Sequence, residues 1–286
     1  MTTTTAAPTE VVTRLEDLAR DIRVSIVSML AHARSGHSAG PLGMADLLAV
    51  LYGEALRHRP EDPAWDERDL FLLSNGHTAP VLYAAMAHTG YFPLDELNTL
   101  RQWGTRLQGH PERLSLPGIE VTSGPLGEGL SQGSGMAQVF QYLDKTPERF
   151  VYVMMGDGEL DEGNIWEAVM YAGKYKLEQL IGIVDRNFIQ IDGNTEDVMP
   201  LGDLAAKFRA FDWHAIDVDG HDIPAILAAI EECKNTKGKP SVIVAHTVPG
   251  KGVPYMEGDY LWHGRVPNPA QAEEALTALN NEGGQR

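Results

Sequence analysis

The apolar residues near the start of the chain recur every three or four positions, which is the spacing of one face of an α-helix. This pattern predicts a long amphipathic helix over residues 10–33. A glycine-rich turn, SGHSAGPLG at residues 35–43, leads into a second predicted helix that continues through residue 55. The segment NPAQAEEALTAL at residues 268–279 predicts a closing helix. The positions that define the first helix are Val12, Leu15, Leu18, Ile22, Ile26, Met29 and Leu30.

Short continuous apolar runs alternate with helical patterns along the rest of the chain. Such runs are typical of strands that are buried on both faces of a parallel sheet. We therefore expect an α/β fold, a parallel sheet with helices on both faces. One domain is expected over residues 10–280, after a disordered tail at residues 1–9. The predicted strands lie at 69–74, 150–156, 180–185, 213–220 and 241–247, and helical patterns at 163–175, 200–209 and 222–233.

The composition narrows the range of partners. Of 286 residues, 43% are hydrophobic, and 40 acidic residues against 23 basic ones give a net charge of −17. This charge repels nucleic acids and anionic membranes, so we expect neither as a partner. An anionic ligand would need local help from a metal ion, a helix N-terminus or basic side chains. With one cysteine, no signal peptide and no run of about 18 apolar residues, we expect a cytoplasmic protein without an internal disulfide.

Two polar turns interrupt the apolar strands. GDGELDEGN at residues 156–164 and DRNFIQIDG at residues 185–193 place Asp157 and Asn187 30 residues apart, each after a predicted strand. Ligands of parallel sheets gather at the carboxyl ends of the strands. A carboxylate, an amide oxygen and a nearby carbonyl suit Mg²⁺ or Ca²⁺, and phosphate oxygens of a cofactor would complete the coordination. The alternative is that both turns merely end strands.

Among the ten histidines, His37, His77, His110 and His263 each adjoin a glycine at a predicted loop, and His221, which follows Gly220, is interpreted as structural. Any one of them alone is more typical of a structural or surface histidine. Together, in an acidic protein, they predict a ring around a polar substrate. Histidine suits proton transfer from hydroxyl groups, because its pKa lies near neutrality.

Eight segments, in order, resemble segments of transketolases, and the resemblance runs from about residue 10 to residue 270. It implies the thiamine-diphosphate-binding fold, specifically the diphosphate-binding domain. The segments are SGHSAGPLGMAD (35–46), LSNGH (73–77), GHPE (109–112), EVTSGPLGEGL (120–130), GDGELDEG (156–163), DRNFIQIDG (185–193), DGHD (219–222) and WHGRVPN (262–268).

The resemblance also implies roles for individual residues. Asp157, Asn187 and the backbone carbonyl of Ile189 match the metal ligands of the family. The four histidines named above match groups that bind substrate hydroxyls and move protons, and Glu162 matches a subunit contact. The implied cofactor-binding residues are Gly124, Leu126, Gly158, Asn187, Ile191, His77 and His263. The implied cofactors are thiamine diphosphate and Mg²⁺ (or Ca²⁺).

In transketolases a separate domain holds the aminopyrimidine of the cofactor and most of the groups that grip the sugar phosphate. The chain ends about where the linker to that domain would begin. The resemblance therefore implies the N-terminal half of a split transketolase, inactive alone, with a C-terminal partner chain in an α2β2 complex. The expected reaction moves a two-carbon ketol unit from a ketose, a sugar phosphate or a related sulfonated or branched sugar, to an aldose.

Three other interpretations remain open at this point. The α subunit of a 2-oxoacid dehydrogenase shares the two polar turns, but decarboxylation does not need the ring of histidines. Deoxyxylulose-phosphate synthase has a different local pattern around these glycines. A non-catalytic binding or regulatory module of the same fold would show an eroded site, whereas Asp157, Asn187 and all four histidines are present.

Overall fold

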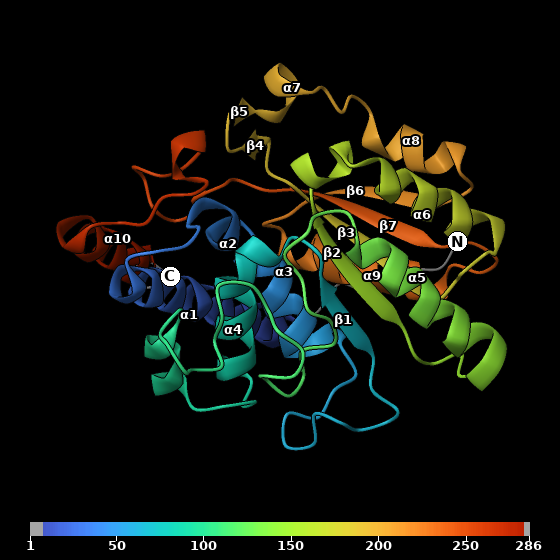
Figure 1. Ribbon diagram of the computed structural model, residues 1–286, viewed down its shortest axis with the longest axis horizontal. Coiled ribbons are helices and arrows are strands. Elements are labelled where there is room, and N and C mark those ends of the chain that lie inside the picture. The colour runs from blue at the N-terminus through green and yellow to red at the C-terminus, as the bar shows by residue number, and fades with distance from the viewer. Residues whose placement is uncertain (1–7, 283–286) are drawn as a thin grey trace.

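The computed structural model describes residues 8–282, and the ribbon in Figure 1 labels its elements. The strands are β1 (Leu70–Leu73), β2 (Val151–Gly156), β3 (Leu180–Arg186), β4 (Ile189–Gln190), β5 (Gly193–Asn194), β6 (His214–Asp219) and β7 (Ser241–His246). The α-helices are α1 (Thr9–Ala33), α2 (Ala39–Gly43), α3 (Ala45–Val50), α4 (Ala79–His88), α5 (Gly129–Gln138), α6 (Gly163–Lys174), α7 (Thr195–Val198), α8 (Leu204–Ala210), α9 (Ile223–Asn235) and α10 (Pro269–Glu282).

The strands of the main sheet are all parallel, in the order β1-β2-β3-β7-β6. After β3 the chain moves out to the edge strand β6 and returns as β7, which pairs with β3. The register sets Gly156 of β2 beside Asp185 of β3. The two polar turns that follow these strands therefore leave the sheet side by side, as expected at the carboxyl ends of parallel strands.

Alternate residues of each strand enter two separate apolar cores. In β2, Tyr152 and Met154 pack into the core beneath α1, α3, α4, α9 and α10, while Val151, Val153 and Met155 pack against α5, α6 and α8. The predicted fold class, a parallel sheet with helices on both faces, is confirmed.

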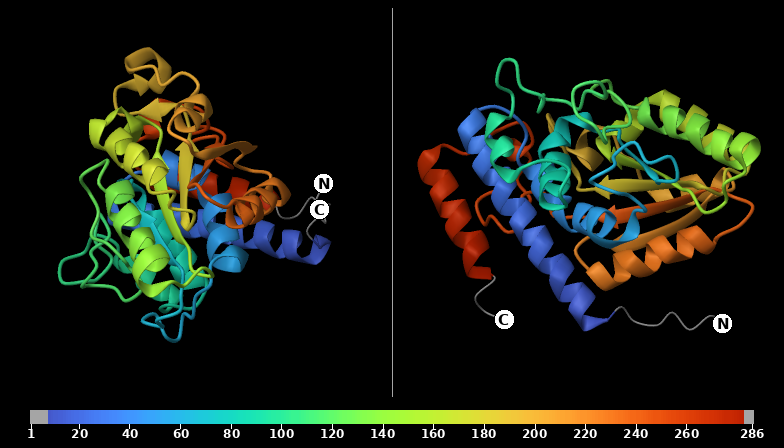
Figure 2. Two further views of the ribbon diagram at one scale, coloured as in Figure 1. Left: turned by 90° about the vertical axis from the view of Figure 1, so that its right-hand side faces the viewer. Right: turned by 90° about the horizontal axis from the view of Figure 1, so that it is seen from below.

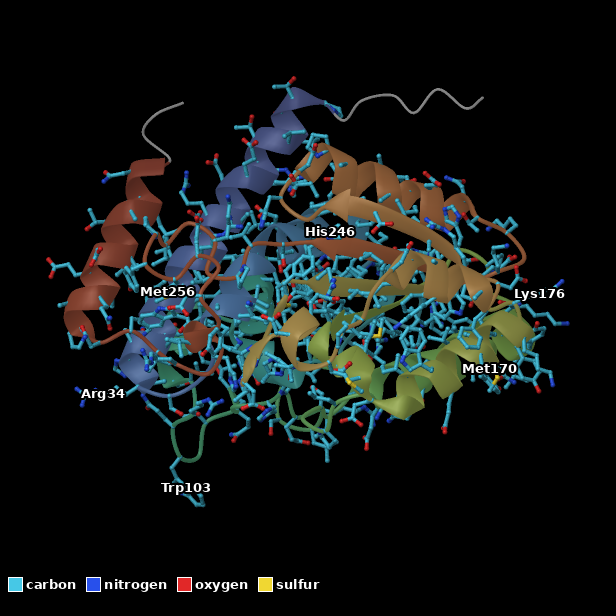
Figure 3. All side chains as sticks on the ribbon, turned by 90° about the horizontal axis from the view of Figure 1, so that it is seen from above. Arg34, Trp103, Met170, Lys176, His246 and Met256 are labelled. Atoms are coloured by element: carbon cyan, nitrogen blue, oxygen red, sulfur yellow. The ribbon has the colours of Figure 1, made fainter. Side chains whose placement is uncertain are left out.

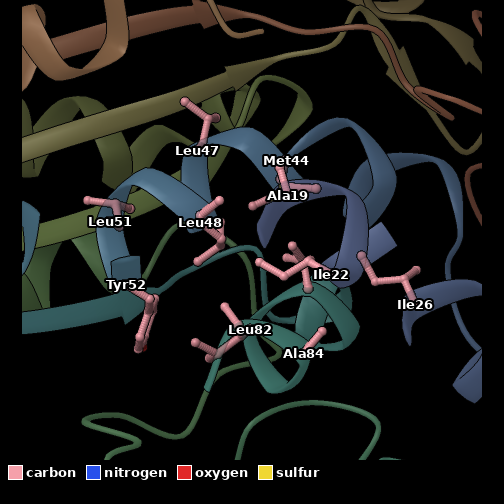
Figure 4. Close-up of a cluster of buried hydrophobic side chains, with 14 of the residues drawn as sticks. Ala19, Ile22, Ile26, Met44, Leu47, Leu48, Leu51, Tyr52, Leu82 and Ala84 are labelled. Carbon is pink, nitrogen blue, oxygen red and sulfur yellow. The ribbon is translucent and has the colours of Figure 1, made fainter. Parts of the chain in front are cut away.

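Helix α1 organises the first of these cores. Its buried residues, among them Ile22 and Ile26, meet α3 and α4 in the close-up of Figure 4. On its other side α1 lies along α10, and Figure 2 shows the two helices next to each other. No helix of the described residues is both long and apolar enough to cross a membrane.

Several elements differ from the sequence-based expectation. The glycine-rich run is itself partly helical (α2), and the predicted second helix ends in a π-helical turn, Leu51–Ala55. Helix α8 begins at Leu204, later than expected, because the Asp203 carboxylate caps it by accepting from the Ala206 N–H at 2.8 Å. The expected tail at 1–9 mostly lies outside the described residues, and Thr9 already belongs to α1.

Helices α4 and α5 have no counterpart among the elements that the sequence pattern predicts. In α4, nearly every residue is buried, so its apolar positions show no helical period. The sequence of α5, GLSQGSGMAQ, contains three glycines and is typical of a loop. These two helices matter for the site, because the loops before them carry cavity residues.

A buried ionic network ties α1, α3 and the segment after β6 together. The Arg23 guanidinium pairs with the Asp46 carboxylate, both side chains being 9% exposed. The Val248 N–H donates to His221 Nε2 at 2.8 Å, so the ring proton sits on Nδ1 and is donated to Asp46 Oδ2 at 2.7 Å. Burial alone would raise the pKa of Asp46, but Arg23 and His221 hold it below its usual value. His221 thus has a structural role in the fold.

We predict that Asp46→Ala lowers the free energy of unfolding by about 3–5 kcal/mol, because Arg23 then stays buried without its partner. Chemical denaturation of the two proteins measures this difference. The matched control is Asp17→Ala, which removes an exposed ion pair with Arg20 on α1 and should change the free energy by at most about 1 kcal/mol. Equal effects of the two substitutions would contradict the assignment.

Candidate active site

A cavity of about 170 Å³ opens at the carboxyl ends of β1, β2 and β3. Its walls come from the loops after these strands, from α2, from the loop before α5 and from the segment around residue 263. Most of the site residues predicted from the sequence line it: His37, His77, Leu126, Asp157, Gly158, Asn187, Ile189, Ile191 and His263. His110 and Gly124 do not line this cavity but lie next to each other, since a Cβ on Gly124 would be 3.7 Å from His110 Cγ.

Asp157 is held rigidly at the end of β2. Its Oδ1 accepts from the Gly158 N–H at 2.8 Å, and its Oδ2 accepts from the Phe188 N–H at 2.7 Å and from Arg186 Nη1 at 3.1 Å. Burial raises the pKa of Asp157 to about 6. The second oxygen is therefore saturated by the protein, whereas Oδ1 has a single donor and remains open to a cation.

Arg186 is a site residue that the sequence patterns do not identify. It ends β3, and its guanidinium lies between Asp157 and Glu196 of α7 with only 5% of the side chain exposed. The centroid of the Phe188 ring lies 4.0 Å from the Arg186 Cζ atom. The sequence does carry one signal for it, since Arg186 is a basic residue at the end of an apolar strand. An arginine buried at such a position requires carboxylate partners.

Asn187 is oriented by a second buried carboxylate, Asp185. The Asn187 amide donates to Asp185 Oδ2 at 2.6 Å, and the Thr247 hydroxyl donates to the other oxygen. The Asn187 Oδ1 is thereby identified as the acceptor atom, and it receives the Ile189 N–H at 3.0 Å. Burial, with the nearby Asp157 charge, raises the pKa of Asp185 to about 7.

The described residues contain no group of three or more His, Cys, Asp or Glu side chains placed to hold a metal ion. The predicted ligand set needs no such group, because it uses one carboxylate, one amide oxygen and one backbone carbonyl. An octahedral cation on these ligands would take its remaining oxygens from a bound phosphate group and water. The oxygens present fit a hard cation that binds together with a diphosphate.

Several polar atoms around the cavity are buried without a hydrogen-bond partner among the described residues. They are His37 Nδ1, Asn75 Oδ1, Gln190 Nε2 and His263 Nδ1, and all four residues line the cavity. Buried polar groups in native proteins are nearly always paired. These unpaired groups therefore fit a cavity whose polar ligand supplies the missing partners.

Three of the four predicted histidines meet at the cavity. The ring centroids of His37 and His77 are 4.9 Å apart, those of His77 and His263 5.2 Å, and those of His37 and His263 5.6 Å. Burial, reinforced by the neighbouring histidines, lowers the pKa of His37 to about 4 and that of His77 to about 3, and burial lowers the pKa of His263. The three rings are therefore neutral at physiological pH, but they are weaker proton acceptors than the near-neutral pKa expected of a histidine would make them.

His110 stands apart, on an exposed part of the loop after residue 100. The ring is only partly withdrawn from solvent, and this partial burial together with the nearby Arg101 charge lowers its pKa. Arg101 also donates to Ser35 Oγ at 3.1 Å, which joins this loop to the turn that carries His37. On the same loop Trp103 is fully exposed, and Figure 3 shows its side chain standing away from the molecule. His110 thus lies at the rim of the histidine cluster.

Known proteins are similar to this chain in both sequence and fold. The family described as "Transketolase, thiamine diphosphate binding domain" matches residues 15–282. The chain is 41% identical over 269 residues to the 6-deoxy-6-sulfo-D-fructose transketolase subunit SqwG of Clostridium sp. (strain MSTE9), and the match covers 94% of this chain and 97% of that protein. It is 39% identical over 258 residues to an apulose-4-phosphate transketolase subunit of Phocaeicola vulgatus, covering 90% and 91% respectively.

Longer transketolases match over part of their length. Transketolase 2 of Escherichia coli (strain K12) is 42% identical, and the match covers 94% of this chain and 41% of that protein. Among solved structures, transketolase from Leishmania mexicana superposes with a TM-score of 0.88 at 37% identity, covering 95% of this chain and 42% of that one.

These similarities favour a transketolase over the α subunit of a 2-oxoacid dehydrogenase, which the sequence patterns leave open. They also account for the fold, because the solved transketolases share it at 30% identity or more. On the match to residues 15–282 and on its likeness to transketolase subunits over nearly their whole length, the chain belongs to the transketolase family.

Proposed function

We propose that this chain is the N-terminal subunit of a split transketolase, which transfers a two-carbon ketol unit from a ketose to an aldose. It would act only with a C-terminal partner chain, in an α2β2 complex in the cytoplasm. The observation that carries the proposal is the convergence of three neutral histidines with an oxygen ligand set on one cavity. Neither feature alone defines a reaction, but together they serve a phosphate-bearing cofactor and a polyhydroxyl substrate.

The cofactor side of the cavity suits thiamine diphosphate with Mg²⁺ (or Ca²⁺). Asp157 Oδ1, Asn187 Oδ1 and the Ile189 carbonyl would hold the cation, and Gly158 lines the cavity beside them. When bound, thiamine diphosphate supplies the electron sink that a two-carbon transfer requires. His77 and His263 are proposed to contact the cofactor, while Gly124, Leu126 and Ile191 are proposed to support its rings.

The histidines would bind the sugar hydroxyls and move their protons. Cleavage of the donor between two hydroxyl-bearing carbons requires removal of a hydroxyl proton, and addition of the acceptor requires its return. A neutral imidazole accepts that proton, whereas an imidazolium does not. The low pKa values of His37 and His77 keep both rings neutral at pH 7, and they also make each ring a weaker base than an ordinary histidine.

The need for a partner is supported by the open side of the site. Ile191, which should contact a ring of the cofactor, is 72% exposed in this chain. An apolar side chain in such a position gains little until another surface covers it. The relatives that match over nearly their whole length carry the word subunit in their names, which also supports a second chain.

The substrate is proposed to be a ketose that carries an anionic group, either a phosphate or a sulfonate. The names of the relatives include one sulfonated sugar and one sugar phosphate, and these names support the class without choosing between its members. The Arg101 guanidinium lies close enough to His110 and His37 to lower the pKa of both rings. This cation would offset the overall acidity of the chain at the rim of the site.

We predict that the chain purified alone has no ketol-transfer activity, since it provides only one side of the site. A chain of the split-transketolase C-terminal type, captured from native lysate with this one, should restore transfer that depends on added thiamine diphosphate and Mg²⁺. Coupled assays of aldose formation measure this. Full activity of the chain alone, or a captured complex that binds the cofactor without turnover, would contradict the proposal.

We predict that Asp157→Asn weakens binding of thiamine diphosphate by about 100-fold, because the variant keeps the shape of the side chain but removes the charge that faces the cation. Isothermal titration of the complex at fixed Mg²⁺ measures the affinity. Asp197→Asn is the matched control, an acid-to-amide change in the exposed turn of α7, and should bind as the unaltered protein does. Unchanged affinity in Asp157→Asn would remove Asp157 from the ligand set.

We predict that His37→Asn lowers kcat by about 10²-fold to 10⁴-fold, the range for loss of a general base. Since a lowered histidine pKa keeps the ring neutral until the pH falls to about 4, the unaltered enzyme should show no loss of kcat/KM from His37 between about pH 6 and 8. Assays at several pH values and NMR of the ¹⁵N-labelled imidazoles test both points. His214→Asn, at the start of the edge strand β6 and outside the cavity lining, is the control. A His37 ring that titrates near its ordinary pKa would contradict the assignment.

A further inference from the structure

One buried carboxylate beside the cavity belongs neither to the predicted cation site nor to the histidine cluster. Glu159 follows the GDG turn, in the short 3₁₀ turn Gly158–Asp161, and is 2% exposed. It borders the cavity. Withdrawing a carboxylate from water costs free energy unless hydrogen-bond donors replace the lost solvent. The donors that surround Glu159 therefore show which segments it holds in place.

Both oxygens of Glu159 are occupied by donors, most of them from other segments. Oε1 accepts from the Ser74 hydroxyl and from the Gly127 N–H at 2.8 Å, and Oε2 accepts from the Gly156 N–H at 3.0 Å. The Ser74 oxygen in turn accepts from the Gly129 N–H at 3.1 Å. One side chain thus joins the end of β1, the end of β2 and the loop that enters α5.

Each of these three segments places a wall residue of the cavity directly next to the atom that Glu159 holds. The wall residues are Asn75 beside Ser74, Leu126 beside Gly127, and Asp157 beside Gly156. The strands β1 and β2 are paired in the sheet, but the loop before α5 is not part of it. Glu159, together with the hydrogen bond from the Gly129 N–H to Ser74, therefore sets the position of the Leu126 wall relative to the other two.

The geometry of the loop before α5 is adapted to this link. Gly127 has a φ of +85°, which disfavours any residue with a side chain. A Cβ at this position would also collide with Asn164 Oδ1 at the start of α6. The Gly127 N–H is consequently presented to Glu159 by a backbone that only glycine adopts without strain.

We propose that Glu159 is a positioning residue that holds the three cavity walls in register for thiamine diphosphate. The inference rests on the proposed function, since it assumes that this cavity binds that cofactor. Glu159 acts through Asn75, Leu126 and Asp157, because all of its hydrogen bonds go to the segments that carry these residues and none goes to a histidine of the cluster. Its loss should therefore weaken cofactor binding and leave sugar binding by the saturated enzyme nearly unchanged.

The carboxylate cannot be replaced by an amide of the same size. The Ser74 hydroxyl and the N–H groups of Gly127 and Gly156 all donate to Glu159. In a glutamine the NH₂ group would face the Gly156 N–H in one orientation and the Ser74 and Gly127 donors in the other. The first orientation leaves the buried Gly156 N–H without an acceptor, and the second leaves the buried Gly127 N–H without one, although the carboxylate had accepted from both.

The test compares Glu159→Gln with Asp161→Asn in the complex of this chain and its partner. Asp161 lies in the same turn, and its substitution removes the same charge from an exposed side chain. We expect Glu159→Gln to raise the Kd for thiamine diphosphate at fixed Mg²⁺ by about tenfold or more, and the control to change it less than about twofold. At saturating cofactor, KM for the donor sugar should stay within about threefold.

Ser74→Ala provides a second variant if Glu159→Gln does not fold. It removes one donor from Glu159 and the acceptor for Gly129, and it should weaken cofactor binding while leaving the sugar KM unchanged. In the double variant the two effects should not add, because they break one network. Cofactor binding at the unaltered affinity in both variants would overturn the inference, as would an equal loss in Asp161→Asn. Failure of the unaltered complex to bind the cofactor would overturn the proposed function itself.

Discussion

The site depends on burying carboxylates at the carboxyl ends of parallel strands. Asp157, Glu159 and Asp185 are each at most 2% exposed, and withdrawing a carboxylate from solvent costs free energy unless donors replace the lost hydration. Their oxygens must find donors, and the sheet offers few at its end. Most of the donors come instead from the surrounding loops, so the shape of those loops is largely determined by three carboxylates. The strand ends fix the position at which each loop starts, and hydrogen bonds to the three buried carboxylates fix the path of the loop.

The histidine cluster follows from the same arrangement on the other side of the cavity. His37 and His77 stand on turns after α1 and β1, and His263 comes from the segment after β7. The three rings remain neutral, because burial and, for His37 and His77, repulsion by neighbouring histidines disfavour the charged form. The cavity thus has one side that suits a cation through buried oxygens and one side that is lined by neutral histidines. A cofactor with a charged diphosphate and a substrate with hydroxyl groups require this separation.

Sequence patterns predict the fold class and most of the cavity residues, because apolar strands and glycine-flanked turns are local signals. They miss α4, which is buried all round, and α5, in which Gly129 packs closely against Ser74 and Gly133 against Val153. They also miss Arg186 and Glu159, which look like ordinary surface charges in the sequence. Their importance arises from contacts between segments distant in the chain, such as that of Glu159 with Ser74. The single-domain boundary at 10–280 and the contact between subunits at Glu162 stay predictions.

The buried carboxylates also explain why one side of the cavity, where Ile191 lies, stays open. The loops after β1, β2 and β3 already carry Asn75, His77, Asp157 and Asn187, all of which line the cavity. The remaining wall, where Ile191 is exposed, cannot be built from the same loops, because they are held by the buried carboxylates behind them. A second chain can supply that wall without disturbing those contacts. On the proposed function, the division into two chains would leave the cation ligands, the histidines and Ile191 on this chain and the surface that covers Ile191 on the other.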